Sequence, residues 1–218
     1  MHRAQAYFLT GTDTEVGKTY AACALLRAAQ AQGQVALGMK PVAAGLDEQN
    51  RNDDVERLIA ASSFATERGL VNQYAFRAAI APHLAAHDEN IDIEFANIAT
   101  ALAELRTLAQ FIVVEGVGGF IVPLTQSTNS ADLAVSLGLP VILVVGLRLG
   151  CLNHALLTVE AIEQRGLQLA GWIANRIDPS MERWQDNLAS LRQRIAAPLL
   201  GTLPHQLEAA AASALSIP

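Results

Sequence analysis

The feature that most constrains this fold is a glycine-bounded segment placed between an apolar run and a helical pattern. The segment GTDTEVGKT spans residues 11–19, after the apolar residues 7–10 and before the helical pattern of residues 20–32. Backbone N–H groups in such a turn, together with the start of a helix, form a cradle for an anion. Lys18 is suited to contact the outer phosphates of a nucleotide, and the Thr19 hydroxyl is suited to bind Mg²⁺. The strict phosphate-loop motif has four residues between its glycines and this segment has five, but the required strand and helix flank it.

Continuous apolar runs recur along the chain, as is typical of parallel strands that are covered on both faces. The expected strands cover residues 7–10, 35–42, 111–115, 141–145, 170–174 and 199–203. Residues with helical spacing lie between them, and the patterns cover residues 20–32, 55–61, 91–105, 152–159 and 184–195. Gly33, Gly138 and Gly166 are expected just after helix ends. The alternation predicts an α/β fold with a mainly parallel sheet and helices on both faces.

The composition favours one folded domain over residues 1–218. With 51% hydrophobic and 17% charged residues, the chain is too apolar to be disordered. A net charge of -6 argues against nucleic-acid and anionic-membrane partners, which need a basic surface. The two cysteines, Cys23 and Cys151, lack metal-site spacing, and no apolar segment is long enough to span a membrane. We therefore expect a cytoplasmic protein.

Charged residues follow two other expected strands. Glu115 comes after four apolar residues and opens a glycine-rich turn, where the metal of a phosphate loop requires an acidic partner. Lys40 ends the second expected strand, and Pro41 after it restricts the backbone. Asp54, with Asp53 beside it, precedes a helical pattern, where capping and first-turn roles explain both residues equally well. From the residues alone, structural and functional interpretations of Lys40 and the aspartates stay open.

Eight segments, in consistent order from one end of the chain to the other, resemble the dethiobiotin synthetases, the ATP-dependent ring-closing enzymes of biotin synthesis. The segments are GTDTEVGKT (11–19), KPVAAG (40–45), RNDD (51–54), APH (81–83), VEGVGG (114–119), PVILVVGLRLGCLNHALLT (140–158), LAGWIANR (169–176) and PLLGTLP (198–204). The resemblance implies a P-loop NTPase fold. It also implies that 7,8-diaminononanoate reacts with CO₂ to give a carbamate, that ATP phosphorylates the carbamate, and that ring closure releases phosphate.

The same resemblance implies roles for individual residues. Lys18 and Lys40 are the implied catalytic residues, which neutralise charge on the carbamate and on the transferring phosphoryl group. The implied Mg²⁺ ligands are Thr19, Asp54 and Glu115. Asp53 is the alternative to Asp54, because the loop before these residues varies in length.

Further positions are implied to contact the nucleotide and the substrate. The nucleotide positions are Glu15, Val16, Gly17, Lys18, Thr19, Tyr20, Asp54, Glu115, Gly116, Val117, Gly118, Asn175, Arg176, Pro204, His205 and Gln206. The substrate positions are Thr12, Lys40, Ala44, Gly118, Gly150, Cys151 and Asn153. Asn175 is expected to read adenine, because its amide offers a donor and an acceptor. Residues 150–153 are expected to begin a helix that reaches the carboxylate of the diamine bound by the other subunit of a homodimer.

Two other functions remain as alternatives. A nucleotide-switch ATPase of the partitioning or metal-delivery type shares this fold, but usually has an extra lysine early in its phosphate loop, and residues 11–14 contain none. A small-molecule kinase would transfer phosphate without bicarbonate. Two positions depart from the synthetase pattern: Ala44 stands where serine is frequent, and Val117 stands where alanine is common.

Overall fold

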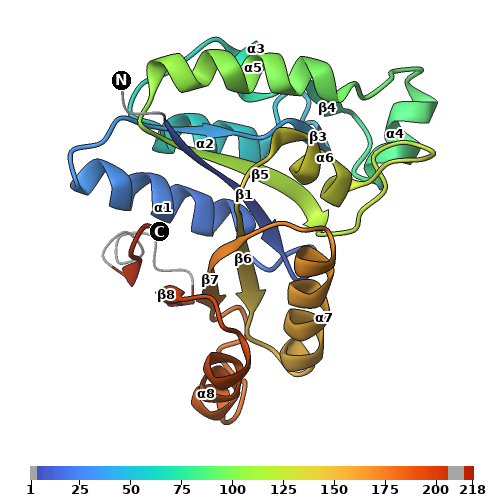
Figure 1. Ribbon diagram of the computed structural model, residues 1–218. Coiled ribbons are helices and arrows are strands. Elements are labelled where there is room, and N and C mark those ends of the chain that lie inside the picture. Colours follow the sequence, from blue (N-terminus) through green and yellow to red (C-terminus); the bar gives the residue numbers. More distant parts are fainter. Residues whose placement is uncertain (1–3, 206–213) are drawn as a thin grey trace.

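The computed structural model describes residues 4–205 and 214–218, and its centre is a six-stranded parallel sheet (Figure 1). The strands are β1 (Gln5–Gly11), β2 (Ala36–Met39), β5 (Phe111–Gly119), β6 (Val141–Gly146), β7 (Leu169–Asn175) and β8 (Leu199–Leu203). Their order across the sheet is β2-β5-β1-β6-β7-β8, and every neighbouring pair is parallel. The predicted α/β class is confirmed.

Helices cover both faces of this sheet. They are α1 (Lys18–Ala31), α2 (Asp53–Ala61), α3 (Arg68–Val71), α4 (Pro82–Asp88), α5 (Phe95–Leu108), α6 (Ser130–Leu137), α7 (Cys151–Gln164) and α8 (Trp184–Arg194). Figure 1 shows α1 and α7 on opposite sides of β6. Successive residues of a strand point to opposite faces, so Val144 packs with α1 while Leu143 and Val145 pack with α7 and α8. No helix among the described residues is long and apolar enough to cross a membrane.

Strand β1 marks the point where the order of the sheet reverses. The chain passes from β1 through α1 to β2 on one side, and later passes from β5 through α6 to β6 on the other side. Ligands of open parallel sheets bind beyond the carboxyl ends of the strands at such a point. The segment of residues 11–19 lies there, because it directly follows β1.

The prediction of one continuous strand over residues 35–42 was wrong. Strand β2 ends at Met39, and β3 (Val42–Ala44) pairs with β4 (Tyr74–Phe76) in a separate two-stranded parallel sheet. The break occurs where Pro41 has no N–H to offer a neighbouring strand. Its carbonyl instead accepts from the backbone N–H of Tyr74 at 2.9 Å. The chain therefore leaves the main sheet at Lys40.

Other boundaries also differ from the prediction. The helix expected from residue 91 begins at Phe95, because the backbone N–H of Ile91 bonds to the carbonyl of Ala86 and closes the end of α4. Strand β5 continues through the glycines to Gly119 instead of ending at Glu115. The three helix-end glycines agree with the prediction, since they have φ values of 81°, 60° and 70° in chain order.

Candidate active site

The loop between β1 and α1 folds back over its own lysine. The Lys18 ammonium donates to the carbonyl of Asp13 at 3.1 Å, and Gly17 starts the helix with φ 83°. A Cβ at position 17 would lie 2.2 Å from Nδ2 of Asn175, so both the backbone conformation and the neighbour require glycine. The Asn175 amide donates to the carbonyl of Val16 at 2.9 Å. The last residue of β7 therefore holds this loop.

Four side chains from four segments meet beneath the loop. Nζ of Lys40 lies 2.7 Å from Oε1 of Glu115 and 3.2 Å from Oδ2 of Asp54. Oγ1 of Thr19 lies 2.6 Å from Oδ1 of Asp54 and 2.8 Å from Oε1 of Glu115. Lys40, Thr19 and Glu115 are buried. The break in the strand at Lys40 and the start of two helices thus bring together the residues that the sequence had singled out.

The two adjacent aspartates, Asp53 and Asp54, have different surroundings. Asn52 caps α2 by accepting from the backbone N–H of Val55 at 3.3 Å, so neither aspartate is needed as the cap. Asp54 contacts Thr19 and Lys40, whereas Asp53 is exposed on the outer side of the helix turn. Asp54 is therefore the one of the pair that belongs to the cluster.

Within this cluster, neighbouring opposite charges offset the effect of burial on the pKa of each charged group. Burial acts to lower the pKa of Lys40, but the carboxylates of Glu115 and Asp54 outweigh it and hold the pKa above its ordinary value. For Asp54, burial acts to raise the pKa, and Lys40 together with the Thr19 hydroxyl brings it below its ordinary value. Lys40 is thus cationic and Asp54 anionic over the neutral pH range.

Lys18 is in a different electrostatic situation. Burial, with Lys40 as the next cause, lowers the pKa of Lys18 to about 8. In the described residues its ammonium donates only to the neutral carbonyl of Asp13. A bound anion beside Lys18 would relieve this penalty, so its position suits an anionic ligand.

The cluster has oxygen atoms suited to a divalent cation. The Thr19 hydroxyl has one proton but faces two carboxylate oxygens within 2.8 Å, so one of those contacts brings lone pairs together. Oε2 of Glu115 is buried and has no hydrogen-bond partner among the described residues. Hydroxyl and carboxylate oxygens are the hard ligands that Mg²⁺ prefers. The residues expected to bind Mg²⁺ therefore fit that ion.

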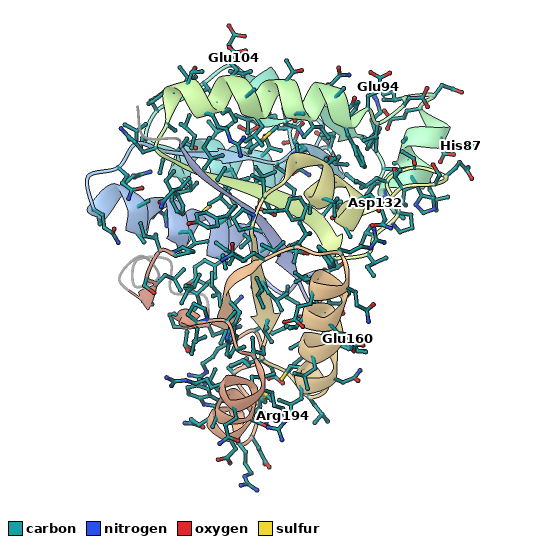
Figure 2. The ribbon with its side chains drawn as sticks, viewed as in Figure 1. His87, Glu94, Glu104, Asp132, Glu160 and Arg194 are labelled. Carbon is teal, nitrogen blue, oxygen red and sulfur yellow. The ribbon has the colours of Figure 1, made fainter. Side chains whose placement is uncertain are left out.

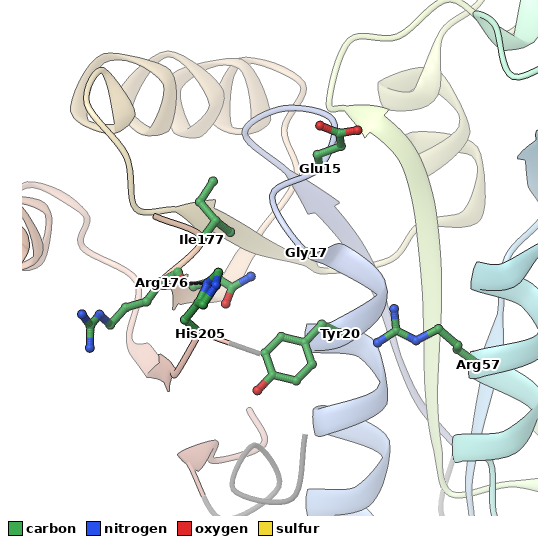
Figure 3. A pocket seen from close by; sticks show the side chains of 8 residues that line it. Glu15, Gly17, Tyr20, Arg57, Arg176, Ile177 and His205 are labelled. Carbon is green, nitrogen blue, oxygen red and sulfur yellow. Dashed lines mark hydrogen bonds between the residues drawn. The ribbon is translucent and has the colours of Figure 1, made fainter. Parts of the chain in front are cut away.

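A cleft of about 720 Å³ opens over the cluster. Its lining includes Lys18, Lys40 and Asp54, together with residues 79–82 just before α4. A second cavity of about 440 Å³ adjoins it across the start of α1 (Figure 3). The lining residues common to both are Glu15, Gly17, Tyr20 and Arg57. The two cavities therefore form one elongated groove that runs past the phosphate loop.

The second cavity collects most of the expected base-binding residues. Asn175, Arg176 and His205 line it, and Nδ1 of His205 lies 3.1 Å from the carbonyl of Arg176. The carbonyl of Pro204 accepts from the Tyr20 hydroxyl at 3.4 Å. Gln206 lies outside the described residues.

The remaining expected positions lie in three parts of the structure. Ala44, Val117 and Gly118 line the large cleft. Val16 is buried under the loop, the Gly116 carbonyl faces Lys40, and Thr12 lines neither cavity of the groove. Gly150, Cys151 and Asn153 lie at the start of α7, away from the cleft lining. The neighbouring Leu149 is 95% exposed there.

Arg57 is a site residue that the sequence reasoning missed. In Figure 3 its side chain extends from α2 toward Tyr20, and it lines both cavities. It stands three residues after Asp54, which places both on one side of a helix. A second missed signal is that Lys18 and Lys40 are the only lysines in the sequence, whose other basic residues are all arginine or histidine.

Comparison with known protein families and relatives gives a consistent result. The family described as "AAA domain" matches residues 5–213. The ATP-dependent dethiobiotin synthetase of Aromatoleum aromaticum is 57% identical over 94% of this chain and 92% of its own. The synthetases of Ralstonia nicotianae and Nitrosospira multiformis are 52% and 50% identical, over 90% and 94% of this chain and 87% and 90% of their own.

Solved structures with low sequence identity share the fold. The MinC–MinD cell division complex of Aquifex aeolicus matches with a TM-score of 0.57 at 15% identity, over 93% of this chain and 82% of that one. A ParA family ATPase of Chlorobium tepidum matches with a TM-score of 0.56 at 12% identity, over 96% and 87%. These likenesses show that the fold is the P-loop NTPase-like α/β fold of these ATPases.

Proposed function

The chain belongs to the family of ATP-dependent dethiobiotin synthetases, and from that premise we propose that the groove beside the phosphate loop is its active site. The enzyme is an ATP-dependent ligase that forms dethiobiotin, with ATP as co-substrate. The observation that carries the site assignment is the buried cluster of Lys40, Asp54, Glu115 and Thr19 at the base of the cleft. Both lysines of the chain lie at this loop, and the described residues contain no second loop of the phosphate-binding type.

The chemistry that we assign to the cleft starts from a diamine, 7,8-diaminononanoate. One amine adds to CO₂, loses a proton and becomes a carbamate anion. A carbamate oxygen then displaces ADP from the γ-phosphorus of ATP and forms a mixed carbamic–phosphoric anhydride. The second amine attacks the carbonyl carbon of this anhydride, phosphate leaves, and the amine loses a proton as the cyclic urea closes.

The carbamate, ATP and the mixed anhydride all carry negative charge, which explains the two lysines in the cleft. Lys18, at the mouth of the loop, is placed to neutralise the outer phosphates. Lys40 is held by two carboxylates, so its ammonium has a fixed position and retains its charge during reaction. A fixed charge that faces the developing charge stabilises the transition state without reorganisation.

Thr19, Asp54 and Glu115 would hold Mg²⁺ in this site. The ion supplies additional neutralisation of the phosphate oxygens when ATP is bound. The support for this assignment is the excess of oxygen lone pairs around the single Thr19 proton, which faces two carboxylate oxygens.

The smaller cavity is assigned to the adenosine part of ATP. Asn175 keeps its Oδ1 as an acceptor while its amide donates to Val16, so it can meet the exocyclic amine of adenine. Arg57 adds a cation between the base end and the phosphate end of the groove. Glu15, Tyr20 and Arg176 line the same stretch.

The start of α7 is assigned to the other subunit of a cytoplasmic homodimer. Gly150, Cys151 and Asn153 do not line this chain's own cleft, yet the N–H groups at a helix start suit a carboxylate. Leu149 beside them is 95% exposed and is therefore accessible to a partner.

Oxygen transfer tests the proposed chemistry directly. Bicarbonate labelled with ¹⁸O is supplied with MgATP and the diamine, and the released phosphate is analysed by mass. A carbamate oxygen that attacks phosphorus leaves with it, so we expect one ¹⁸O in each phosphate. Unlabelled phosphate would mean that water or another group attacks ATP, and would favour a switch ATPase or a hydroxyl kinase.

A further inference from the structure

A small cavity adjoins the cluster, and Glu115 and Val117 line both this cavity and the large cleft. Its volume is about 10 Å³, and its lining includes Glu115, Ser130, Leu124 and Leu133. One water molecule needs ~10–15 Å³ of such space together with two or more polar partners. The cavity therefore has room for one water and for no larger ligand.

Two side-chain atoms without partners belong to residues on its wall. Oε2 of Glu115 and Oγ of Ser130 are both buried, and neither has a hydrogen-bond partner in the described part of the chain. The residues are 1% exposed each. Buried polar groups are nearly always satisfied, by protein or by ordered water, so two such atoms at one water-sized cavity indicate a shared partner.

The Ser130 hydroxyl has no role in its own helix. Asn129 caps α6 by accepting from the N–H groups of Ala131 and Asp132, and the Asp132 carboxylate accepts from the Asn129 N–H. The backbone N–H of Ser130 donates to the carbonyl of Val122 at 2.9 Å. The helix start is thus complete without the hydroxyl, which has no partner of its own among the described residues.

We propose that Ser130 is a positioning residue for Glu115 and acts through one water held in this cavity. The Ser130 hydroxyl donates to the water, and the water donates to Oε2 of Glu115. Because Lys40 and Thr19 hold Oε1, the carboxylate is then fixed at both oxygens. Groups that orient a metal-binding carboxylate set metal affinity, so Ser130 tunes how well Glu115 serves Mg²⁺. This inference rests on the proposed metal site.

Binding without turnover tests the proposal. The affinity for a non-hydrolysable ATP analogue is measured by calorimetry in excess Mg²⁺ and in EDTA. The dissociation constant in EDTA divided by that in Mg²⁺ gives the contribution of the metal to binding. We expect Ser130→Ala to reduce this ratio about tenfold, which is the usual effect of removing a group that orients a metal ligand. The affinity in EDTA should not change. Ser136→Ala is the control, since that hydroxyl bonds only within α6 to Leu133, and it should leave the ratio unchanged.

Two further measurements separate the outcomes. Ser130→Cys keeps the shape of the side chain but replaces the hydroxyl with a larger and weaker hydrogen-bonding thiol, so it should also lower the ratio. It replaces Ser130→Ala should that variant not fold. Glu115→Gln should lower the ratio strongly; a wild-type ratio there would refute the metal site itself. A lowered ratio in Glu115→Gln with wild-type ratios in both Ser130 variants would refute only the role of Ser130. A high-resolution crystal structure should show the water between Ser130 and Glu115, and no density there would contradict the proposal.

Discussion

At the scale of single residues, the two lysines of this chain differ in their electrostatic environment. Lys40 lies between two carboxylates, so its pKa is above the ordinary value, whereas burial and Lys40 bring the pKa of Lys18 to about 8. A pair of cations at short range is unfavourable until an anion arrives. The free enzyme thus holds at Lys18 a charge that phosphate binding stabilises.

The pKa of Lys18 can be measured directly because the sequence contains only two lysines. With isotope-labelled lysine, NMR should show two side-chain signals, one that titrates near pH 8 and is absent in Lys18→Met, and one that does not titrate below its ordinary range. Bound phosphates raise the pKa of Lys18, so ATP-analogue binding takes up a proton, and affinity falls as pH rises above about 8. A Lys18 signal that titrates only above pH 10 would contradict this.

Lys40→Met should reduce both stability and turnover. The substitution keeps most of the apolar stem but leaves the buried Glu115 and the partly exposed Asp54 without their cation. Breaking a buried ion pair in this way costs ~3–5 kcal/mol in the free energy of unfolding. Loss of one fixed charge at the reacting groups lowers kcat by roughly 10²–10³. Urea denaturation and steady-state assays measure the two effects.

The double variant Lys40→Met, Glu115→Gln is the matched control for that experiment. Removal of one unpaired carboxylate should recover part of the stability and none of the turnover. Recovery of turnover would assign Lys40 a structural role alone.

At the scale of elements, the last residue of β7 and the first turn of α1 hold the phosphate loop together. Gly17→Ala places a Cβ 2.2 Å from Nδ2 of Asn175, and it also forces alanine to φ 83°. Gly33 has φ 81° with nothing near its Cβ position, so Gly33→Ala has the same backbone strain without the clash.

The two alanine variants should therefore differ in a defined way. Gly33→Ala should cost ~1–2 kcal/mol of stability from backbone strain and leave nucleotide affinity unchanged. Gly17→Ala should cost more and should weaken nucleotide binding at least tenfold, because Asn175 must release Val16. Thermal unfolding and calorimetry check both. Equal effects of the two variants would show that Asn175 does not hold the loop.

The elements also show where sequence reasoning succeeds and where it stops. Long apolar strands and the phosphate loop were predicted because hydrophobic period and glycine spacing are local signals. The three-residue strand β4 and the split at Pro41 were not, because they depend on pairing between distant segments. Asp53 and Asp54 could not be separated by spacing, since only the rotation of α2 decides which one faces Thr19. The lysine count did carry a usable signal for both cationic site residues.

At the scale of the whole molecule, the side chains of Glu104, His87 and Arg194 project outward in Figure 2, while the two lysines are buried at the groove. The residues at the helix start, 150–153, are not part of this chain's own cleft lining. We therefore propose that a second copy of the chain completes the substrate site. Without it, the diamine carboxylate lacks its proposed partner.

Leu149→Glu should disrupt that assembly. A charge at this 95% exposed position would be buried unpaired at the proposed interface, so sedimentation should show a shift from dimer to monomer. Diamine-dependent turnover should fall while ATP-analogue binding persists. Leu108→Glu, at a 41% exposed position on α5, serves as the control. A monomeric wild-type enzyme with full activity would contradict the proposal.

The most direct test of the central claim is phosphate release from MgATP by the wild-type enzyme, with the diamine and bicarbonate each present or omitted. We expect release to require both compounds and one phosphate to form per ring closed. The product should be the diamine plus one carbonyl less two hydrogens. Release that is indifferent to the diamine and bicarbonate would contradict the account, because the two lysines would then serve ATP hydrolysis alone.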